Sequence, residues 1–437
     1  MRIQGETAAG IFDSIRDQVQ ARVIAPGQAL PPVRELAVAL GVNRNTVAAA
    51  YKRLVSAGIA ITQGRHGTSI RPAQGPGEQE GSLPGSPLTD LASGNPATAW
   101  LPDMARVCRA VAAVPRLYGE PTLNADLADS ARAWLDDDPP AGYALDLCHG
   151  AVDAVERLLA AWLAPGDKVA VEDPCFLGSL NTLRYVGLVP VGVPVDEEGL
   201  RPEALADSLA QGVRAVICTP RAHNPTGASF SPARAKALRR VLADFPQALL
   251  IEDDHFGPLS ATPYRSLIAP ATAHWALVRT LSKCHGPDLR LAVVASDAET
   301  SRRLRLRLAP GNVWVSHVLQ DMAHVLLSSP EDSRRVGEAR EDYAQRRRTL
   351  ADALRAQGIA SWSRGDGLNV WVPLAVAGRD VAGRLARLGW LVRVADSFCV
   401  DTPVQAIRVT VAELAPARAA RFARDLRACL DALQAAA

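Results

Sequence analysis

The sequence predicts two folded parts of different class: a small N-terminal domain of helices followed by two strands, and a larger α/β domain built on a mostly parallel sheet. Three observations lead to this prediction. Apolar residues recur at helical spacing up to Leu54, a Pro- and Gly-rich segment occupies 71–87, and short apolar runs that end in polar residues follow it. The chain has 437 residues, more than one hydrophobic core usually spans, so several domains are expected.

Composition is that of a globular protein outside the membrane. Hydrophobic residues make up 48% of the chain, charged residues 22%, and the net charge is +2. No apolar run approaches the length of a membrane helix, and the N-terminus has no signal-peptide pattern. The seven cysteines are scattered without a C-x-x-C pair, which favours a reduced, cytoplasmic protein and predicts no metal site.

The first 70 residues contain three successive helical patterns and an excess of basic side chains. Gly41 separates the second pattern from the third and leaves Asn43 as the expected N-cap. Two short helices joined by a tight turn predict a helix-turn-helix, whose second helix enters the major groove of DNA. The apolar positions are Ile11, Ile15, Val19 and Val23 in the first pattern, Val33, Leu36, Ala37 and Leu40 in the second, and Val47, Ala50, Tyr51 and Leu54 in the third.

Polar residues of the third pattern are suited to reading bases, because arginine and asparagine bind guanine and adenine edges with two hydrogen bonds. The segment 59–70 predicts two short strands around a basic tip, a wing for phosphate or minor-groove contact. The alternative is a helical bundle that only packs on the larger domain; the basic third helix and the wing together argue against it. The candidate DNA-binding residues are Arg34, Arg44, Asn45, Thr46, Lys52, Arg65, His66 and Thr68.

One lysine in the larger domain has the surroundings of a Schiff-base nucleophile. Lys283 follows Thr280-Leu-Ser and precedes Arg290 by seven residues. A desolvated amine beside another cation has a lowered pKa and condenses readily with an aldehyde. The arginine and the threonine would then hold a phosphate of that aldehyde. The alternative is a solvated surface lysine.

Two other segments decide between these alternatives. The apolar run 215–218 leads into His223-Asn-Pro-Thr-Gly, and the run 248–251 leads into Glu252-Asp-Asp-His. Each pattern predicts a buried strand that delivers polar residues at its carboxyl end, which is where open α/β sheets bind their ligands.

In this order and at these distances, the three segments resemble those of the fold-type I aminotransferases, which depend on pyridoxal 5′-phosphate (PLP). The resemblance implies that Lys283 forms the Schiff base with PLP, that Asp253 contacts the pyridinium nitrogen and that Asn224 contacts the ring 3-oxygen. It implies Arg290 and Thr280 as phosphate ligands. A carboxylate beside the ring nitrogen keeps it protonated, and so keeps the ring an electron sink.

Four further residues match positions of the same family, and a fifth, Ala151, departs from it. Phe176 resembles the residue that stacks on the coenzyme ring, or it is a plain core phenylalanine. Tyr118 resembles the tyrosine that reaches the PLP phosphate of the neighbouring subunit, which implies a homodimer. Gly150 begins a helix and offers backbone N–H groups to phosphate, while Ala151 lacks the hydroxyl that the family usually has there. Arg408 resembles the arginine that grips an α-carboxylate, or it forms a structural salt bridge.

His255 departs from the pattern, because related regulators have a tyrosine there that donates to the ring oxygen. Histidine donates only as the right tautomer, and His223 is a competing neighbour. We therefore expect PLP binding without efficient transamination. The expected boundaries are 1–70 for the winged helix-turn-helix, 71–87 for the linker and 88–437 for the aminotransferase-like body, with 119–329 as its large domain and 88–118 together with 330–437 as its small domain.

The N-terminal motifs also resemble a family. Leu30-Pro-Pro-Val-Arg-Glu, Asn43-Arg-Asn-Thr-Val and Gly64-Arg-His-Gly-Thr resemble the winged helix-turn-helix of GntR-family bacterial regulators. A GntR-like head, a short linker and an aminotransferase-like body form the architecture of MocR-type regulators, and His255 with the third helix resembles their PtsJ-like branch. This implies a homodimeric transcription regulator that binds operator DNA and senses PLP, in control of vitamin B6 salvage. An active aminotransferase with a DNA-binding head and a DNA-binding protein with a scaffold body remain alternatives.

Overall fold

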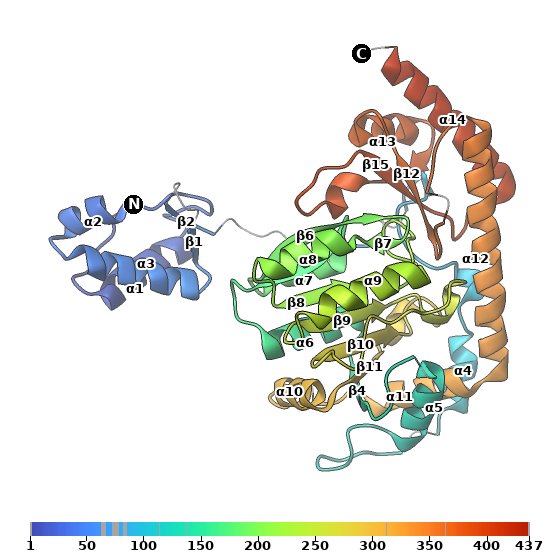
Figure 1. The fold of residues 1–437 in the computed structure, drawn as a ribbon, viewed down its shortest axis with the longest axis horizontal. Coiled ribbons are helices and arrows are strands. Elements are labelled where there is room, and N and C mark those ends of the chain that lie inside the picture. Colours follow the sequence, from blue (N-terminus) through green and yellow to red (C-terminus); the bar gives the residue numbers. More distant parts are fainter. Residues whose placement is uncertain are drawn as a thin grey trace. The chain divides into compact units, whose positions relative to one another are not determined.

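The computed structural model describes residues 2–62, 67–71, 78–81, 85–112, 114–136, 138–311, 313–362 and 364–435. The chain divides into two compact units, Met1–Gly77 and Glu78–Ala437 (Figure 1). Each unit has its own hydrophobic core. Among the described helices, none combines the length and the hydropathy that a membrane span requires.

The first unit contains the predicted three helices and two strands. Thr7 caps the first helix, because its hydroxyl accepts a hydrogen bond from the backbone N–H of Gly10. The two strands pair antiparallel, with Ala60 opposite Ile70, as expected for a wing. The elements are α1 (Ala8–Gln20), α2 (Val33–Leu40), α3 (Arg44–Ser56), β1 (Ala60–Thr62) and β2 (Thr68–Ile70).

The first helix ends earlier than its apolar spacing predicts. α1 stops at Gln20, and Arg22 has a φ of +56°, a left-handed conformation that cannot continue a helix. Val23 is 55% exposed, and Ile24 is fully buried in the core instead. The prediction that Val23 lies on the buried face was therefore wrong, since the chain turns before reaching it.

The second unit is centred on an eight-stranded sheet in the order β4-β11-β10-β9-β8-β5-β6-β7. The five strands from β10 to β6 in this order are parallel to one another, whereas β11 runs antiparallel to both its neighbours and β7 antiparallel to β6. The predicted mostly parallel sheet is thus confirmed. The strands are β4 (Ala144–Cys148), β5 (Lys168–Asp173), β6 (Val189–Asp196), β7 (Gly199–Leu200), β8 (Ala215–Cys218), β9 (Leu249–Asp254), β10 (Trp275–Thr280) and β11 (Ala292–Ser296).

Helices cover both faces of this sheet, because successive strand residues point to opposite sides and both sides are apolar. Val216 and the next residue, Ile217, belong to different core clusters. One cluster includes α5 (Ala125–Leu135), α8 (Pro202–Ala210), α9 (Pro232–Ala243) and α11 (His317–Ser328); the other includes α6 (Ala151–Trp162), α7 (Leu177–Tyr185) and α10 (Ala298–Leu308). The short helix α4 (Met104–Ala110) precedes them in the chain.

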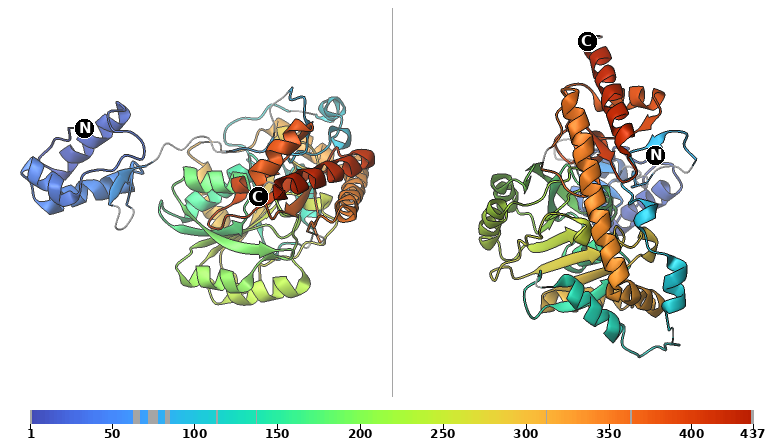
Figure 2. Two further views of the ribbon diagram at one scale, coloured as in Figure 1. Left: turned by 90° about the horizontal axis from the view of Figure 1, so that it is seen from above. Right: turned by 90° about the vertical axis from the view of Figure 1, so that its right-hand side faces the viewer.

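The C-terminal part of the second unit is built on a small sheet and a long helix. The 27-residue helix α12 (Pro330–Ala356) runs along one side of the unit and joins the large sheet region to the small one (Figures 1 and 2). The strand β3 (Thr89–Asp90) pairs with β13 (Trp390–Leu391), so the start of the unit lies against its C-terminal part. The other elements are α13 (Gly378–Arg387), α14 (Pro416–Gln434) and the sheet of β12 (Asn369–Pro373), β15 (Ala406–Thr410) and β14 (Arg393–Val394).

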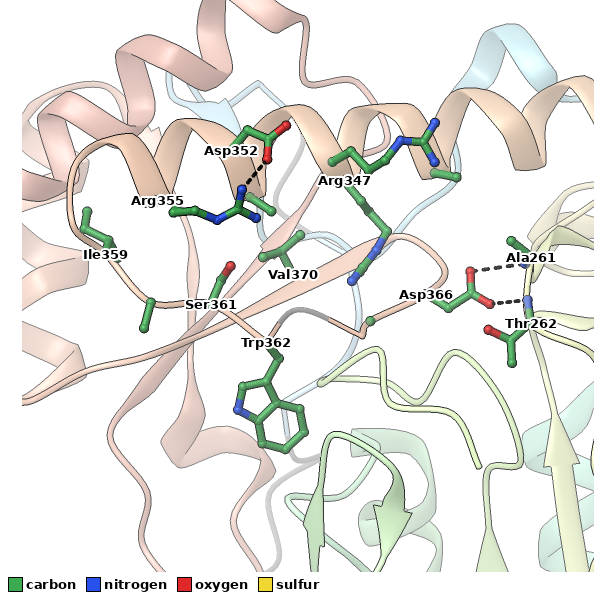
Figure 3. A pocket seen from close by; sticks show the side chains of 15 residues that line it. Ala261, Thr262, Arg347, Asp352, Arg355, Ile359, Ser361, Trp362, Asp366 and Val370 are labelled. Carbon is green, nitrogen blue, oxygen red and sulfur yellow. Dashed lines mark hydrogen bonds and ion pairs between the residues drawn. The ribbon is translucent and has the colours of Figure 1, made fainter. Parts of the chain in front are cut away.

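A pocket of about 390 Å³ lies beside α12 (Figure 3). Arg347 points into it from the helix, and across from it Asp366 accepts a hydrogen bond from the backbone N–H of Thr262 at 2.9 Å. Burial lowers the pKa of Arg347 to about 10, although nearby Asp366 raises it. None of the residues that the sequence predicts for the coenzyme site lines this pocket.

Candidate coenzyme site and DNA-binding surface

The candidate coenzyme site gathers at the carboxyl ends of β8, β9 and β10. These strands are parallel neighbours, so their ends lie at one edge of the sheet. Asn224 follows β8, Asp253 lies at the end of β9, and Lys283 follows β10. The order of the strands therefore brings together three residues that are up to 59 positions apart in the sequence.

Lys283 differs from the other lysines of the chain. There are four in all, and Lys52, Lys168 and Lys236 are exposed, whereas Lys283 is only partly exposed. Its Nζ donates a hydrogen bond to the carbonyl oxygen of Gly94 at 2.7 Å. Removal of the ammonium from water lowers its pKa, and this effect outweighs the opposing influence of nearby carboxylates. A lowered pKa increases the fraction of neutral amine, which is the nucleophilic form.

One buried carboxylate oxygen of Asp253 lacks a hydrogen-bond donor among the described residues. Its Oδ1 has no hydrogen-bond partner among the described residues, and its Oδ2 lies 3.6 Å from Nδ1 of His255. A buried carboxylate oxygen without a donor is costly, so a donor from a ligand would stabilise it. A protonated pyridinium nitrogen is such a donor, and the predicted role of Asp253 fits this geometry.

His255 lies beside Asp253 in the same site. Its ring is nearly parallel to that of Phe176, with 5.9 Å between the ring centroids and 20° between the planes. Within the described part of the chain, neither ring nitrogen has a hydrogen-bond partner. The structure thus brings both predicted residues together with Asp253 and leaves the imidazole available to a ligand.

His223, in contrast, is engaged with other side chains. Its Nδ1 lies 2.7 Å from the hydroxyl oxygen of Thr226, and its Nε2 lies 3.2 Å from Oε2 of Glu172. The hydroxyl of Thr219 also donates to Glu172, at 3.0 Å. These contacts hold the buried His223 at the ends of the strands, which leaves His255 as the better candidate for a ligand contact.

Gly150, Ala151 and Arg290 form a cradle suited to a phosphate. Gly150 has a φ of +92°, and a Cβ at this position would lie 3.1 Å from Nη2 of Arg290, so glycine lets the guanidinium approach. The same Nη2 donates to the carbonyl oxygen of His149 at 3.3 Å. α6 begins at Ala151, and the first N–H groups of a helix are available to an anion. Ala151 adds no hydroxyl, so the backbone and the arginine would provide the binding.

The hydroxyl of Thr280 is already used within the protein. It donates to the carbonyl oxygen of Leu291 at 3.2 Å, and its oxygen lies 3.0 Å from the hydroxyl of Ser282. Thr280 would therefore reach a phosphate only after its proton turns away from the backbone. Its role as a phosphate ligand stays a prediction.

Arg408 does hold a carboxylate, although not one that the sequence pattern indicated. Its Nη1 and Nη2 donate to the two carboxylate oxygens of Glu80 at 2.6 and 2.9 Å. Asn224 contacts both partners: its Oδ1 accepts from Arg408 at 2.8 Å, and its Nδ2 donates to Glu80 at 2.8 Å. Sequence reasoning missed Glu80, because a glutamate in a Pro- and Gly-rich segment carries no local signal.

Asp254 is a second residue that sequence reasoning did not assign. Its carboxylate accepts two hydrogen bonds from Arg221 at 2.8 Å each and one from Arg279 at 2.7 Å. Burial raises the pKa of Asp254, but the two arginines outweigh this and lower it to about 2. Adjacent strand residues point to opposite sides of a sheet, which explains why Asp253 and Asp254 have separate partners. This alternation was the signal in the sequence that could have separated the roles of the two aspartates.

Tyr118 lies on the surface of the chain. Its side chain is 91% exposed, and its ring meets the edge of Trp314 with 5.4 Å between the centroids. A residue that reaches into a neighbouring subunit must be exposed in the isolated chain. Its role at the partner's phosphate stays a prediction.

The helix-turn-helix presents four of the predicted DNA-binding side chains to solvent. Gly41, with a φ of +67°, ends α2, and the side chain of Asn43 caps α3 by accepting a hydrogen bond from the N–H of Asn45 at 2.8 Å. Tyr51 ties the buried side of α3 to the preceding loop, because its hydroxyl donates to the carbonyl oxygen of Pro31 at 2.8 Å.

Four of the six candidate DNA-binding residues that the structure describes are exposed. Arg34, Arg44, Asn45 and Lys52 are exposed, and Thr46 and Thr68 are half-buried. Two further candidates at the tip of the wing, Arg65 and His66, lie outside the described residues.

Comparisons with known proteins match the two units to two different families. Residues 86–426 match the family model of aminotransferase class I and II, and residues 7–70 match that of bacterial regulatory proteins of the gntR family. The chain is 49% identical to the vitamin B6 salvage pathway transcriptional repressor PtsJ of Salmonella typhimurium, over 98% of this chain and 100% of that protein. It is 30% identical to the HTH-type pyridoxine biosynthesis transcriptional regulator PdxR of Corynebacterium glutamicum, over 79% of this chain and 78% of that protein.

A solved structure shares the fold of the body. The multiple substrate aminotransferase of Thermococcus profundus superposes with a TM-score of 0.72 and 19% identity, covering 81% of this chain and 94% of that one. The aminotransferase fold supports PLP as the cofactor of this body, as the sequence predicted. With a gntR-family head and a class I and II aminotransferase body in one polypeptide, the chain belongs to the MocR-type regulators of the GntR family.

Proposed function

We propose that the protein is a cytoplasmic, homodimeric transcription regulator that binds operator DNA and responds to PLP, and that it represses genes of vitamin B6 salvage. The observation that carries this proposal is the likeness to PtsJ, a named vitamin B6 salvage repressor, because it extends through both the DNA-binding head and the body. The likeness to PdxR, named for pyridoxine biosynthesis, also supports the assignment of the regulated genes to vitamin B6 metabolism.

The chain's own residues support PLP as the signal. PLP supplies an aldehyde for a lysine amine and a ring that withdraws electrons. Lys283 would provide the amine, and Oδ1 of Asp253, which has no partner in the described part of the chain, would accept the ring N–H. Gly150 and Arg290 would bind the phosphate. These roles require no catalytic turnover, which suits a sensor.

An exposed apolar segment supports the homodimer. Val114, Leu117 and Tyr118 are 62%, 73% and 91% exposed and lie within five positions of one another. Apolar side chains gathered on a surface mark an interaction site, and the expected role of Tyr118 makes a second copy of this chain the proposed occupant.

The seven cysteines are all free, which agrees with a reducing compartment.

An active aminotransferase is the second candidate. It is favoured by the presence of Lys283, Asp253, Asn224 and Arg408 in one body. The pairing of Arg408 with Glu80 weighs against it, because the substrate carboxylate would have to compete. Sustained production of a keto acid from PLP-loaded protein and an amino donor would support this candidate over a pure regulator.

We expect PLP to change operator affinity by roughly 5- to 150-fold, the range of an allosteric coupling of about 1–3 kcal/mol. A ligand shifts an equilibrium only by binding one state better than another, and thermodynamic linkage makes the coupling between PLP and operator reciprocal. Fluorescence anisotropy measures the operator affinity on DNA fragments from around the protein's own gene, with and without PLP. The affinity for PLP, measured with and without operator, should change by the same factor. Equal operator affinities in the two forms would refute PLP sensing.

The head should show two kinds of DNA contact. Arg44→Ala is expected to cost about 1–3 kcal/mol on the operator and little on unrelated DNA, because a bidentate contact reads one base. Lys52→Ala should weaken binding to all sequences and lower the salt slope by about one unit, as loss of a phosphate contact does. Salt titrations of both variants test this, with the exposed Arg302→Ala of the body as the matched control. Equal losses on both DNAs for Arg44→Ala would exclude a base contact.

A further inference from the structure

The anion site formed by Arg408 is filled by a side chain of the same protein. Both oxygens of Glu80 accept from the two terminal nitrogens of the guanidinium, the bidentate geometry in which arginine binds carboxylates most strongly. The side chain of Arg408 is fully buried and that of Glu80 is 17% exposed. A buried arginine needs a counter-ion, so this site holds either Glu80 or the carboxylate of a ligand.

The surroundings are shaped for this carboxylate. Asn224 donates a third hydrogen bond to Oε1 of Glu80. At Gly94, a Cβ would lie 2.6 Å from Oε2 of Glu80 and 3.2 Å from Nη2 of Arg408, so any larger residue there would collide with the pair. The carbonyl oxygen of Gly94 also accepts from Lys283. Glu80 binds the arginine and is close enough to Lys283 for the two charges to interact.

The charge state of Glu80 agrees with its position. Burial raises the pKa of Glu80, but Arg408, Lys283 and the hydrogen bond from Asn224 more than compensate, so the pKa lies below its ordinary value. Glu80 is thus ionised at neutral pH. It carries the same charge as the α-carboxylate of an amino acid.

The backbone on either side of Glu80 is held in place. Arg393 binds Oε2 of Glu78 at 3.1 Å and donates to the carbonyl oxygens of Gln79 and Gly81 at 3.1 and 2.9 Å. The hydroxyl of Ser397 donates to Oε2 of Glu78 at 2.6 Å. These contacts preorganise the segment 78–81, so its carboxylate meets Arg408 at a high effective concentration.

We propose that Glu80 is a built-in carboxylate ligand of Arg408 that excludes free amino-acid carboxylates, so that the site accepts an aldehyde coenzyme but discriminates against amino acids. The inference rests on the proposed function and deepens it, because it names the ligand class that the sensor refuses.

The test compares two amines that differ in one carboxylate. 2-Methylalanine has an α-carboxylate and no α-hydrogen, so it cannot be transaminated; isopropylamine has a hydrogen in place of the carboxylate. Each is titrated by calorimetry into PLP-loaded wild type, Glu80→Ala, Glu80→Gln and the surface control Glu338→Ala. Glu338 is an exposed carboxylate on α12 that pairs only loosely with Arg334 at 3.8 Å.

We expect Glu80→Ala to bind 2-methylalanine at least about tenfold more tightly than wild type, because the vacated bidentate site accepts its carboxylate. Glu80→Gln should change in the same direction, since it keeps the size and removes the charge. Affinity for isopropylamine should stay unchanged in both variants, which also shows that the site is intact, and Glu338→Ala should match wild type for both amines.

Unchanged affinity of both Glu80 variants for 2-methylalanine would overturn the inference. A tighter binding of both amines alike would also overturn it, because the effect would not depend on the carboxylate. If either result appears while PLP still shifts operator affinity, only the role of Glu80 fails. If PLP does not shift operator affinity, the proposed function fails whatever the amines show. Should Glu80→Ala not fold, the isosteric Glu80→Gln decides.

Discussion

Replacing Lys283 with alanine is expected to abolish covalent attachment of PLP completely and to remove the visible absorbance of the bound coenzyme. Lys283 is the one lysine of the chain that is not fully exposed, and partial burial lowers its pKa, which increases the fraction of nucleophilic neutral amine. Borohydride reduction of the PLP-loaded protein followed by peptide mapping measures the attachment. Wild type should carry the label on Lys283, and Lys283→Ala should carry none.

The exposed lysines provide matched controls for this experiment. Lys168→Ala and Lys236→Ala remove a primary amine without touching the site, so both should be labelled on Lys283 as in wild type. Lys283→Ala should also lose most of the response of operator affinity to PLP, if attachment and signal are coupled. A label on another lysine would show that the strand ends of β8, β9 and β10 are not the attachment site.

Replacing Asp254 with alanine is expected to destabilise the protein by about 3–5 kcal/mol, the cost of removing one partner from a buried ion pair. Asp254 is fully buried and binds Arg221 and Arg279, so the change would leave the guanidinium groups of both arginines short of a counter-ion. Arg279 keeps a second partner in Asp138, at 2.6 Å, which limits the loss. Urea unfolding followed by circular dichroism measures the free energy.

The same carboxylate should make stability depend on acid pH. Its pKa falls from 3.8 to about 2 on folding, so the pairing contributes stability above pH 3.8 and loses it as the pH drops toward 2. Asp254→Ala should flatten the stability profile in this range. The control Glu338→Ala, at an exposed ion pair, should change the unfolding free energy by less than about 1 kcal/mol. A similarly small loss for Asp254→Ala would contradict a structural role for the cluster.

Local sequence patterns determined much of this protein. Apolar spacing located the helices of the first unit, although it failed at Val23, where the left-handed backbone of Arg22 ends α1. The three motifs around Asn224, Asp253 and Lys283 predicted a ligand site, because parallel strands place their carboxyl ends at one edge of the sheet. These features depend on residues close in sequence or on a simple rule of sheet topology.

The tertiary structure alone decided which partners the charged residues have. Glu80 and Arg408 are 328 positions apart, and neither has a neighbour in sequence that indicates the other. Strand alternation predicts that Asp253 and Asp254 point to opposite sides of the sheet, but it does not show that one has a carboxylate oxygen without a partner among the described residues while the other binds two arginines. A side chain's partner depends on which distant backbone lies within hydrogen-bond reach after folding, and periodicity and motif spacing do not contain that information.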